Sequence, residues 1–246
     1  MNQILITKKL YITPELKRKK KIYKANFVLS IFFLVILISI YLYAAYARDK
    51  AEAVSQEILQ NAEMEQEDNT VANSDVLIAV LNDTTDDGNE TPVVLDTTNK
   101  NKTKQQSASG YTYVVDGKVT IPKINVEYAI LDGESDSEAE TEELLKTSPV
   151  KFHGPEINEV GNYCIVGHNY RNSKFFSKVP TLVNGDIIQI TDSVGNMIQY
   201  QIYDKYIVDP TDVSCTSQNT GGKKEITLIT CTDDSKQRVI VKARAI

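Results

Sequence analysis

The C-terminal part of this 246-residue chain has the pattern of an all-β barrel or sandwich, and a helix that crosses a membrane is expected before it. Two observations predict this architecture. Residues 111–246 consist of short apolar, β-branched runs separated by turn-forming residues, which is typical of all-β domains. Residues 25–47 contain no charged side chain and are almost wholly apolar from Phe27 to Tyr43. We therefore expect one membrane helix and one globular β domain.

The strands of the β domain are predicted from apolar runs with a period of two residues. A short helix is expected over residues 137–146, a further turn over residues 174–179, and Phe175 and Phe176 are expected in the core. The predicted strands cover residues 111–115, 118–121, 126–131, 162–168, 186–191, 197–209, 225–231 and 237–245.

The membrane segment is long enough to span a bilayer, since residues 25–47 would extend over more than the ~30 Å hydrocarbon core at ~1.5 Å per residue. Residues 1–24 hold eight basic side chains against one acid, a net charge of +7. The positive-inside rule places that end in the cytoplasm and the C-terminal part outside the cell. Ala45-Tyr46-Ala47 resembles a signal-peptide cleavage site, but the apolar run is longer than a usual signal sequence, which favours a retained anchor.

The segment between the membrane and the β domain is polar. Residues 48–66 have helical spacing and are expected to form a stalk, whereas residues 67–110 are rich in Asp, Asn, Thr, Ser and Lys. Such a composition buries little apolar surface, so a flexible spacer is expected. The predicted organisation is a basic cytoplasmic segment (1–24), a membrane anchor (25–47), a stalk and linker (48–110) and an extracellular domain (111–246).

Charge and cysteine content exclude two classes of protein. Beyond residue 24 the chain holds 19 basic and 32 acidic residues, a net charge of −13, and a domain this acidic is not expected to bind nucleic acid. Three cysteines, an odd number, argue against a disulfide framework. Cys164 is expected to pack in the core, Cys215 has no assigned role, and a bridge between them is not favoured.

Cys231 and Arg238 are predicted to be neighbours across a β-hairpin. Residues 225–231 read as one strand, Thr232-Asp233-Asp234-Ser235 carries turn chemistry, and residues 237–245 read as the next strand. If the hairpin is centred on Asp234 and Ser235, Cys231 lies directly opposite Arg238, with Cβ atoms roughly 4.5 to 5.5 Å apart.

Together with His168, which ends another apolar run, these residues form a candidate active site. A cysteine attacks as its thiolate, an imidazole can transfer protons, and an arginine can stabilise an oxyanion with its planar fork. The alternatives are a buried, inert cysteine and a structural histidine.

The run Thr227-Leu228-Ile229-Thr230-Cys231, the strand ending in Val166-Gly167-His168-Asn169, and the segment that begins at Arg238 resemble a sortase over residues 111–246. Sortases are cysteine transpeptidases of Gram-positive bacteria. The resemblance implies a closed eight-stranded β-barrel in which Cys231 is the nucleophile, His168 the general acid/base and Arg238 the oxyanion or substrate-positioning cation. The short spacing from Cys231 to Arg238 resembles class D.

The resemblance also implies partners. These are surface proteins with a C-terminal, LPxTG-like sorting signal, a peptidoglycan precursor or other amine as acceptor, and the cell membrane. A pilin-polymerising sortase is an alternative, although the sequence shows neither its Asp-Pro-aromatic lid motif nor its C-terminal membrane helix, and a non-catalytic surface binding module is another.

No cofactor is predicted, and calcium is kept as an alternative. Some sortases bind calcium through loop carboxylates, and calcium favours such ligands. Glu156, Glu159, Asp209 and Asp212 lie in the corresponding loops, but their spacing departs from that of calcium-dependent members. His153, followed by Gly154-Pro155, is expected in a turn.

Overall fold

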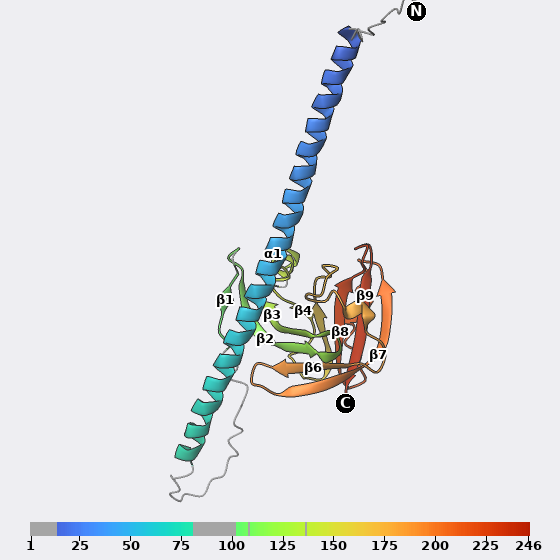
Figure 1. Cartoon of the computed structure of the whole chain (residues 1–246). Coiled ribbons are helices and arrows are strands. Elements are labelled where there is room, and N and C mark those ends of the chain that lie inside the picture. The colour runs from blue at the N-terminus through green and yellow to red at the C-terminus, as the bar shows by residue number, and fades with distance from the viewer. Residues whose placement is uncertain (1–13, 81–101, 108, 136) are drawn as a thin grey trace, which may run out of the picture. The chain divides into compact units, whose positions relative to one another are not determined.

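The computed structural model describes residues 14–80, 102–107, 109–135 and 137–246 (Figure 1). The described residues divide into two compact units, one that ends at Asp49 and one that begins at Lys50. Residues 1–13 of the predicted basic segment and residues 81–101 of the predicted spacer lie outside the described residues. The helix α1 (Pro14–Val80) contains the apolar run and continues beyond the predicted stalk. Within the described residues it is the one helix long and apolar enough to cross a membrane.

The second unit is built around a single mixed sheet of nine strands, in which β3 with β4 and β5 with β8 pair in parallel and the other neighbours are antiparallel. Its spatial order is β1-β2-β3-β4-β5-β8-β9-β7-β6, and pairing of β2 with β6 closes the strands β2 to β9 into a barrel, whose curvature is visible in Figure 1. This confirms the predicted closed eight-stranded barrel, with β1 as a two-residue addition. The strands are β1 (Gln105–Gln106), β2 (Thr112–Ile121), β3 (Val126–Gly133), β4 (Val150–His153), β5 (Gly161–Val166), β6 (Ile187–Asp192), β7 (Met197–Val208), β8 (Lys224–Cys231) and β9 (Arg238–Ala245).

Two strand predictions were wrong. The runs expected at residues 111–115 and 118–121 form one strand, β2, whose pairing with β3 shifts between Val115 and Gly117. The Asp116-Gly117 pair marks this bulge rather than a turn, because Asp116 is buried and accepts a hydrogen bond from Tyr163 Oη at 2.6 Å. The strand β4 was not predicted, and His153 is its last residue rather than a turn residue.

The barrel interior is filled with aliphatic and aromatic side chains. Phe175 and Phe176 are almost fully buried, as predicted. Phe175 stacks on Tyr128 with ring centroids 5.0 Å apart, and its backbone N–H donates to Tyr128 Oη at 3.1 Å. Burial of Phe175 and Phe176 therefore anchors the loop that follows β5 to the core. His168 lies in the same loop.

The helix α2 (Glu138–Leu144) lies where a short helix was expected. Ser137 is its N-cap and accepts a hydrogen bond from the Glu140 backbone N–H, which satisfies an N–H that the helix itself leaves without a partner. The buried Glu140 side chain in turn accepts the Ser135 N–H at 2.8 Å and the Ser135 hydroxyl at 2.9 Å. These bonds fix where the helix begins. Three single-turn 3₁₀ helices complete the fold: η1 (Pro122–Ile124), η2 (Val179–Thr181) and η3 (Ser214–Thr216).

The part of α1 that belongs to the second unit packs on the barrel. Ile58 and Leu59 are 6% exposed and cluster with Leu131, Leu144 and Val150. Ser55 Oγ is buried 3.0 Å from Ser148 Oγ, and Gln56 Nε2 donates to the Glu127 carbonyl at 3.1 Å. This stretch of helix thus completes a second apolar cluster outside the barrel interior.

Truncation of Leu59 should therefore destabilise the second unit. Leu59→Ala in the full chain is expected to lower the free energy of unfolding by about 2 to 3 kcal/mol, because it removes buried methyl groups and leaves a cavity. Urea denaturation in detergent, followed by tyrosine fluorescence, measures the loss. Val54→Ala is the control on the same helix, since Val54 is 37% exposed, and we expect it to change stability by less than about 0.5 kcal/mol. Equal effects of the two substitutions would contradict the packing.

Candidate active site

His168 and Cys231 follow two parallel strands that are paired in register. The strands β5 and β8 pair up to Val166 opposite Ile229, and the Gly167 N–H donates to the Ile229 carbonyl at 3.0 Å. His168 and Cys231 are each two residues beyond that last pair. The parallel register therefore brings the ends of both strands, with the imidazole and the thiol, to the same edge of the sheet.

The hairpin between β8 and β9 has the register that the sequence predicts. Cys231 pairs with Arg238, the Thr232 N–H donates to the Gln237 carbonyl at 3.0 Å, and the Ser235 N–H closes the turn on the Thr232 carbonyl at 2.8 Å. The prediction that Cys231 lies opposite Arg238 is confirmed. Cys231 consequently has the end of β5 on one side and Arg238 on the other.

The junction of β5 and β8 is held by side-chain hydrogen bonds. The buried Thr230 hydroxyl donates to the Gly167 carbonyl at 2.8 Å, and Asn169 Nδ2 donates to the Cys231 carbonyl at 3.0 Å. Gly167 admits no side chain, because a Cβ there would lie 2.5 Å from the Phe176 ring. These contacts fix the backbone on both sides of His168.

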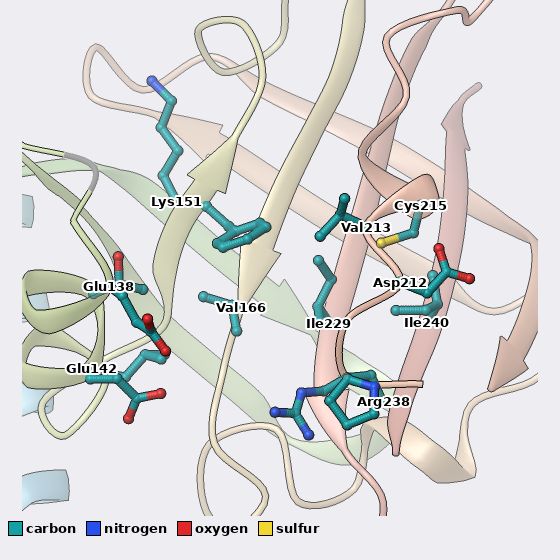
Figure 2. A pocket seen from close by; sticks show the side chains of 14 residues that line it. Glu138, Glu142, Lys151, Val166, Asp212, Val213, Cys215, Ile229, Arg238 and Ile240 are labelled. Atoms are coloured by element: carbon teal, nitrogen blue, oxygen red, sulfur yellow. The ribbon is translucent and has the colours of Figure 1, made fainter. Parts of the chain in front are cut away.

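A pocket of about 390 Å³ adjoins these strand ends, and Arg238 is the one candidate catalytic residue that lines it, since His168 and Cys231 are not among its lining residues. Val166, Ile229, Arg238 and Ile240 line it (Figure 2). Because side chains two residues apart point to the same face of a strand, Cys231, the last residue of β8, is on the face of Ile229. The pocket thus extends along the face of the sheet that Cys231 shares with Ile229 and Arg238.

The ring of His168 is partly buried against other aromatic side chains. Its centroid lies 5.0 Å from that of Tyr170, and Tyr170 contacts Phe175 edge-on at 5.5 Å. Burial lowers the pKa of His168 below its usual value, a shift that the negative charge of Glu142 opposes and the positive charge of Lys146 reinforces. A lower pKa favours the neutral imidazole at neutral pH, the form that can accept a proton.

The helix α2 contributes residues that the sequence did not single out. Glu138 and Glu142 line the pocket on the side opposite Asp212, Val213 and Cys215, as Figure 2 shows. The sequence places both glutamates on a helix, but which of its faces meets the pocket depends on the tertiary fold. The only signal in the sequence for a role of these glutamates was the repeated acidic residues of the segment 138–143.

Of the other two thiols, Cys215 belongs to a wall of the pocket and Cys164 is not among the lining residues. Cys164 and Cys215 are buried in one apolar cluster, and all three cysteines are free. Burial raises the pKa of Cys164 to about 12 and also raises that of Cys215. Cys164 is a core residue, as predicted, and Cys231 is the partly exposed thiol.

A carboxylate cluster lies away from the pocket's catalytic end. Asp116, Asp132 and Glu156 approach within 4.8 Å of one another, a set that shares only Glu156 with the loop acids considered from the sequence. Lys151 Nζ lies 3.0 Å from Asp132 and 3.3 Å from Glu156, and Lys102 contacts both Asp116 and Glu156.

Two ammonium groups therefore already balance much of the charge of this cluster. Burial alone would raise the pKa of Glu156, but the hydrogen bond from Lys102 and the charge of Lys151 outweigh it and lower the pKa to about 2. The carboxylates thus form ion pairs with Lys102 and Lys151, and a metal ion would have to compete with these lysines. The expectation of no metal stays a prediction.

The sortase domain model matches residues 119–246. The match covers the barrel from the last residues of β2 onward and includes all three candidate residues, and the chain belongs to the sortase family. The family assignment made from the sequence is therefore confirmed, and a sortase is a transpeptidase that acts on sorting-signal substrates.

Solved sortase structures resemble the chain in the same region. A Clostridium perfringens sortase D5 transpeptidase is 29% identical, covering 58% of this chain and 82% of its own, with a TM-score of 0.46. Listeria monocytogenes sortase A is 24% identical, covering 54% and 87%, with a TM-score of 0.47. Clostridium perfringens sortase C, solved with the C-terminal cell wall sorting motif, is 20% identical, covering 54% and 70%, with a TM-score of 0.46. No curated protein matches the sequence.

The exposure of the three thiols predicts selective alkylation. Iodoacetamide should modify Cys231 of the folded chain at least about tenfold faster than Cys164, because a buried thiol with a raised pKa offers little accessible thiolate. Peptide mass mapping after a timed reaction measures this ratio. All three cysteines should react after denaturation, which serves as the control. Equal labelling of Cys164 and Cys231 in the folded chain would contradict the described burial.

Proposed function

We propose that this sortase cleaves an LPxTG-like sorting signal after its threonine, forms a thioester between that threonine and Cys231, and transfers the threonyl acyl group to a cell-wall amine. The observation that carries the proposal is the register of three strand ends. Cys231 lies opposite Arg238 and beside the strand that leads to His168, on the face that lines the pocket. This arrangement supports a mechanism in which Cys231 as the nucleophile, His168 as the proton-transfer group and Arg238 as the cation act on one substrate carbonyl.

In this mechanism the Cys231 thiolate attacks the carbonyl carbon of the Thr-Gly bond. The resulting oxyanion collapses to a thioester, the C–N bond breaks, and His168 in its imidazolium form donates a proton to the leaving amine. The neutral imidazole then accepts a proton from the incoming amine, which attacks the thioester and releases Cys231. The lowered pKa of His168 supports the second step more directly than the first.

Arg238 is proposed to stabilise the oxyanion or to position the substrate carbonyl. Among the described residues it forms no ion pair, and its guanidinium donates one long hydrogen bond of 3.4 Å, from Nη1 to the Gln237 carbonyl. Its fork is therefore available to a substrate, for which two parallel N–H donors are well suited.

The chain is proposed to be anchored by the apolar run of α1, with the basic residues 1–24 in the cytoplasm and the catalytic domain outside. The apolar helix supports the anchor, and the net charge of +7 supports the orientation. Surface proteins with a sorting signal would then meet the enzyme at the outer face of the membrane, where peptidoglycan precursors supply the amine.

The proposal predicts a covalent intermediate. A peptide carrying a sorting motif should leave an acyl adduct on Cys231 that hydroxylamine removes, and Cys231→Ala should abolish both cleavage and adduct, as mass spectrometry of the purified chain can show. In intact cells, a membrane-impermeant form of the same peptide should label Cys231 from outside. An adduct on Cys164 or Cys215 would overturn the nucleophile, and labelling only after cell lysis would overturn the orientation.

The role of Arg238 predicts a contrast between two cations of the same hairpin. Arg238→Ala should reduce kcat by about 100- to 1000-fold, the usual cost of losing an oxyanion donor, and Arg238→Lys should also be impaired because it loses the planar fork. Lys236 is exposed in the turn, so Lys236→Ala should change kcat less than about twofold. Matched thermal stability of the three variants is the control. If Lys236→Ala is as damaging as Arg238→Ala in folded proteins, Arg238 is not the catalytic cation.

A further inference from the structure

One wall of the pocket is formed by a single face of α2. Glu138, Thr141, Glu142 and Leu145 line it, and their spacing of three, four and seven residues places them in one row along a helix. In Figure 2 the side chains of Glu138 and Glu142 lie across the pocket from Asp212 and Val213, with Val166 and Ile229 between the two walls. An occupant of the pocket would therefore pass beside two carboxylates.

The charges of this wall are not neutralised by the described part of the chain. Glu138 and Glu142 are exposed and form no ion pair there, whereas the next residue, Glu143, pairs with Lys146 at 2.5 Å. Of the two cations that line the pocket, Lys151 is paired with Asp132 and Glu156. Arg238 stands at the Cys231 end.

Asp212 adds a third acidic group on the opposite wall. Hydrogen bonds from Ser214 lower its pKa below the usual value, so it is ionised at neutral pH. The pocket away from Arg238 is consequently acidic on both sides, which favours a cationic group in an occupant.

The floor of the pocket is apolar. Val166, Ile229 and Ile240 form it, and Val213 and Leu145 extend it onto the walls. An extended peptide that places an apolar side chain on this floor turns the next side chain away from the floor, because successive side chains of an extended strand point to opposite faces, and the exposed side chains of Glu138 and Glu142 are accessible there. The pocket thus suits a peptide with one apolar and one basic residue.

The position of Glu142 indicates which residue of the peptide would be basic. Its charge acts on His168, so Glu142 lies toward the catalytic end of the wall, and Glu138 lies one helical turn away. Successive residues of an extended peptide are separated by about 3.3 Å. With the scissile threonine at Cys231, the residue directly before it is the variable residue nearest to the catalytic end, where Glu142 lies.

We infer that the sorting signal cleaved by this enzyme carries lysine or arginine at its variable position, and that Glu138 and Glu142 select it. The inference rests on the proposed function, because it assumes that the pocket holds the sorting signal. Its ligand is indicated by the pocket's continuity with Cys231 and Arg238, and the acidic wall supplies the preference among sorting signals.

The preference can be measured with three peptides of the form Leu-Pro-x-Thr-Gly in which x is lysine, glutamine or glutamate. With the full-length enzyme in detergent and hydroxylamine as the acceptor, we expect kcat/KM to fall in that order. The lysine peptide should exceed the glutamate peptide by about tenfold at low salt, a size appropriate to exposed charge pairs. The ratio should shrink as ionic strength rises.

Variants of the wall separate charge selection from a general defect. In Glu138→Gln/Glu142→Gln the ratio of lysine to glutamate peptide should fall to about twofold or less, whereas the matched Glu143→Gln should keep the ratio of the unmodified enzyme. Glu142→Gln also removes a charge that raises the pKa of His168, so the limb of the pH–rate profile that reports His168 should move to lower pH. This second effect is the same for all three peptides and does not alter the ratio.

The outcomes distinguish failure of this inference from failure of the proposed function. If no peptide acylates Cys231, the proposed function is contradicted. If all three are cleaved at equal rates, the function stands and the inferred selectivity is overturned. If the double variant keeps the peptide ratio but loses rate with cationic acceptor amines, the wall binds the acceptor, which also overturns the inference.

Discussion

The site depends on the pairing of β8 with a parallel neighbour on one side and an antiparallel neighbour on the other. The register of the parallel pairing with β5 determines how far along the sheet His168 lies relative to Cys231. The register of the antiparallel pairing with β9 places Arg238 opposite Cys231. A slip of one residue in either pairing would turn the neighbouring side chain to the opposite face of the sheet. The backbone hydrogen bonds of the barrel thus determine which side chains share the pocket.

The sequence predicted the hairpin well and the rest of the barrel less well, for physical reasons. The link between β8 and β9 is short and contains turn-forming residues, so local chemistry determines the register. The parallel pairing of β5 with β8 joins segments more than sixty residues apart, and only the family resemblance indicated that His168 meets Cys231. The strand β4 was missed because Val150–His153 is four residues long and half exposed, which leaves no alternation to detect.

The division of β2 into two predicted strands has a different cause. Asp116 and Gly117 have the residue types of a turn, and sequence alone cannot show that the Asp116 carboxylate is buried and bonded to Tyr163 and Lys102. A buried carboxylate is costly unless it is hydrogen-bonded and paired. The bulge is therefore stabilised by partners that lie far away in the sequence, and its local pattern indicates the wrong structure.

The helix α2 connects the membrane-proximal helix to the pocket through its two faces. Leu144 clusters with Ile58 and Leu59 of α1, while Glu138 and Glu142 line the pocket. Because the helix has only seven residues, and short isolated helices are marginal in water, its position depends on this packing and on the Ser137 cap. The orientation of the acidic wall is therefore coupled to the stretch of α1 that follows the membrane segment. In this sortase the residues between the apolar run of α1 and the barrel contribute to the structure around the pocket and are more than a tether.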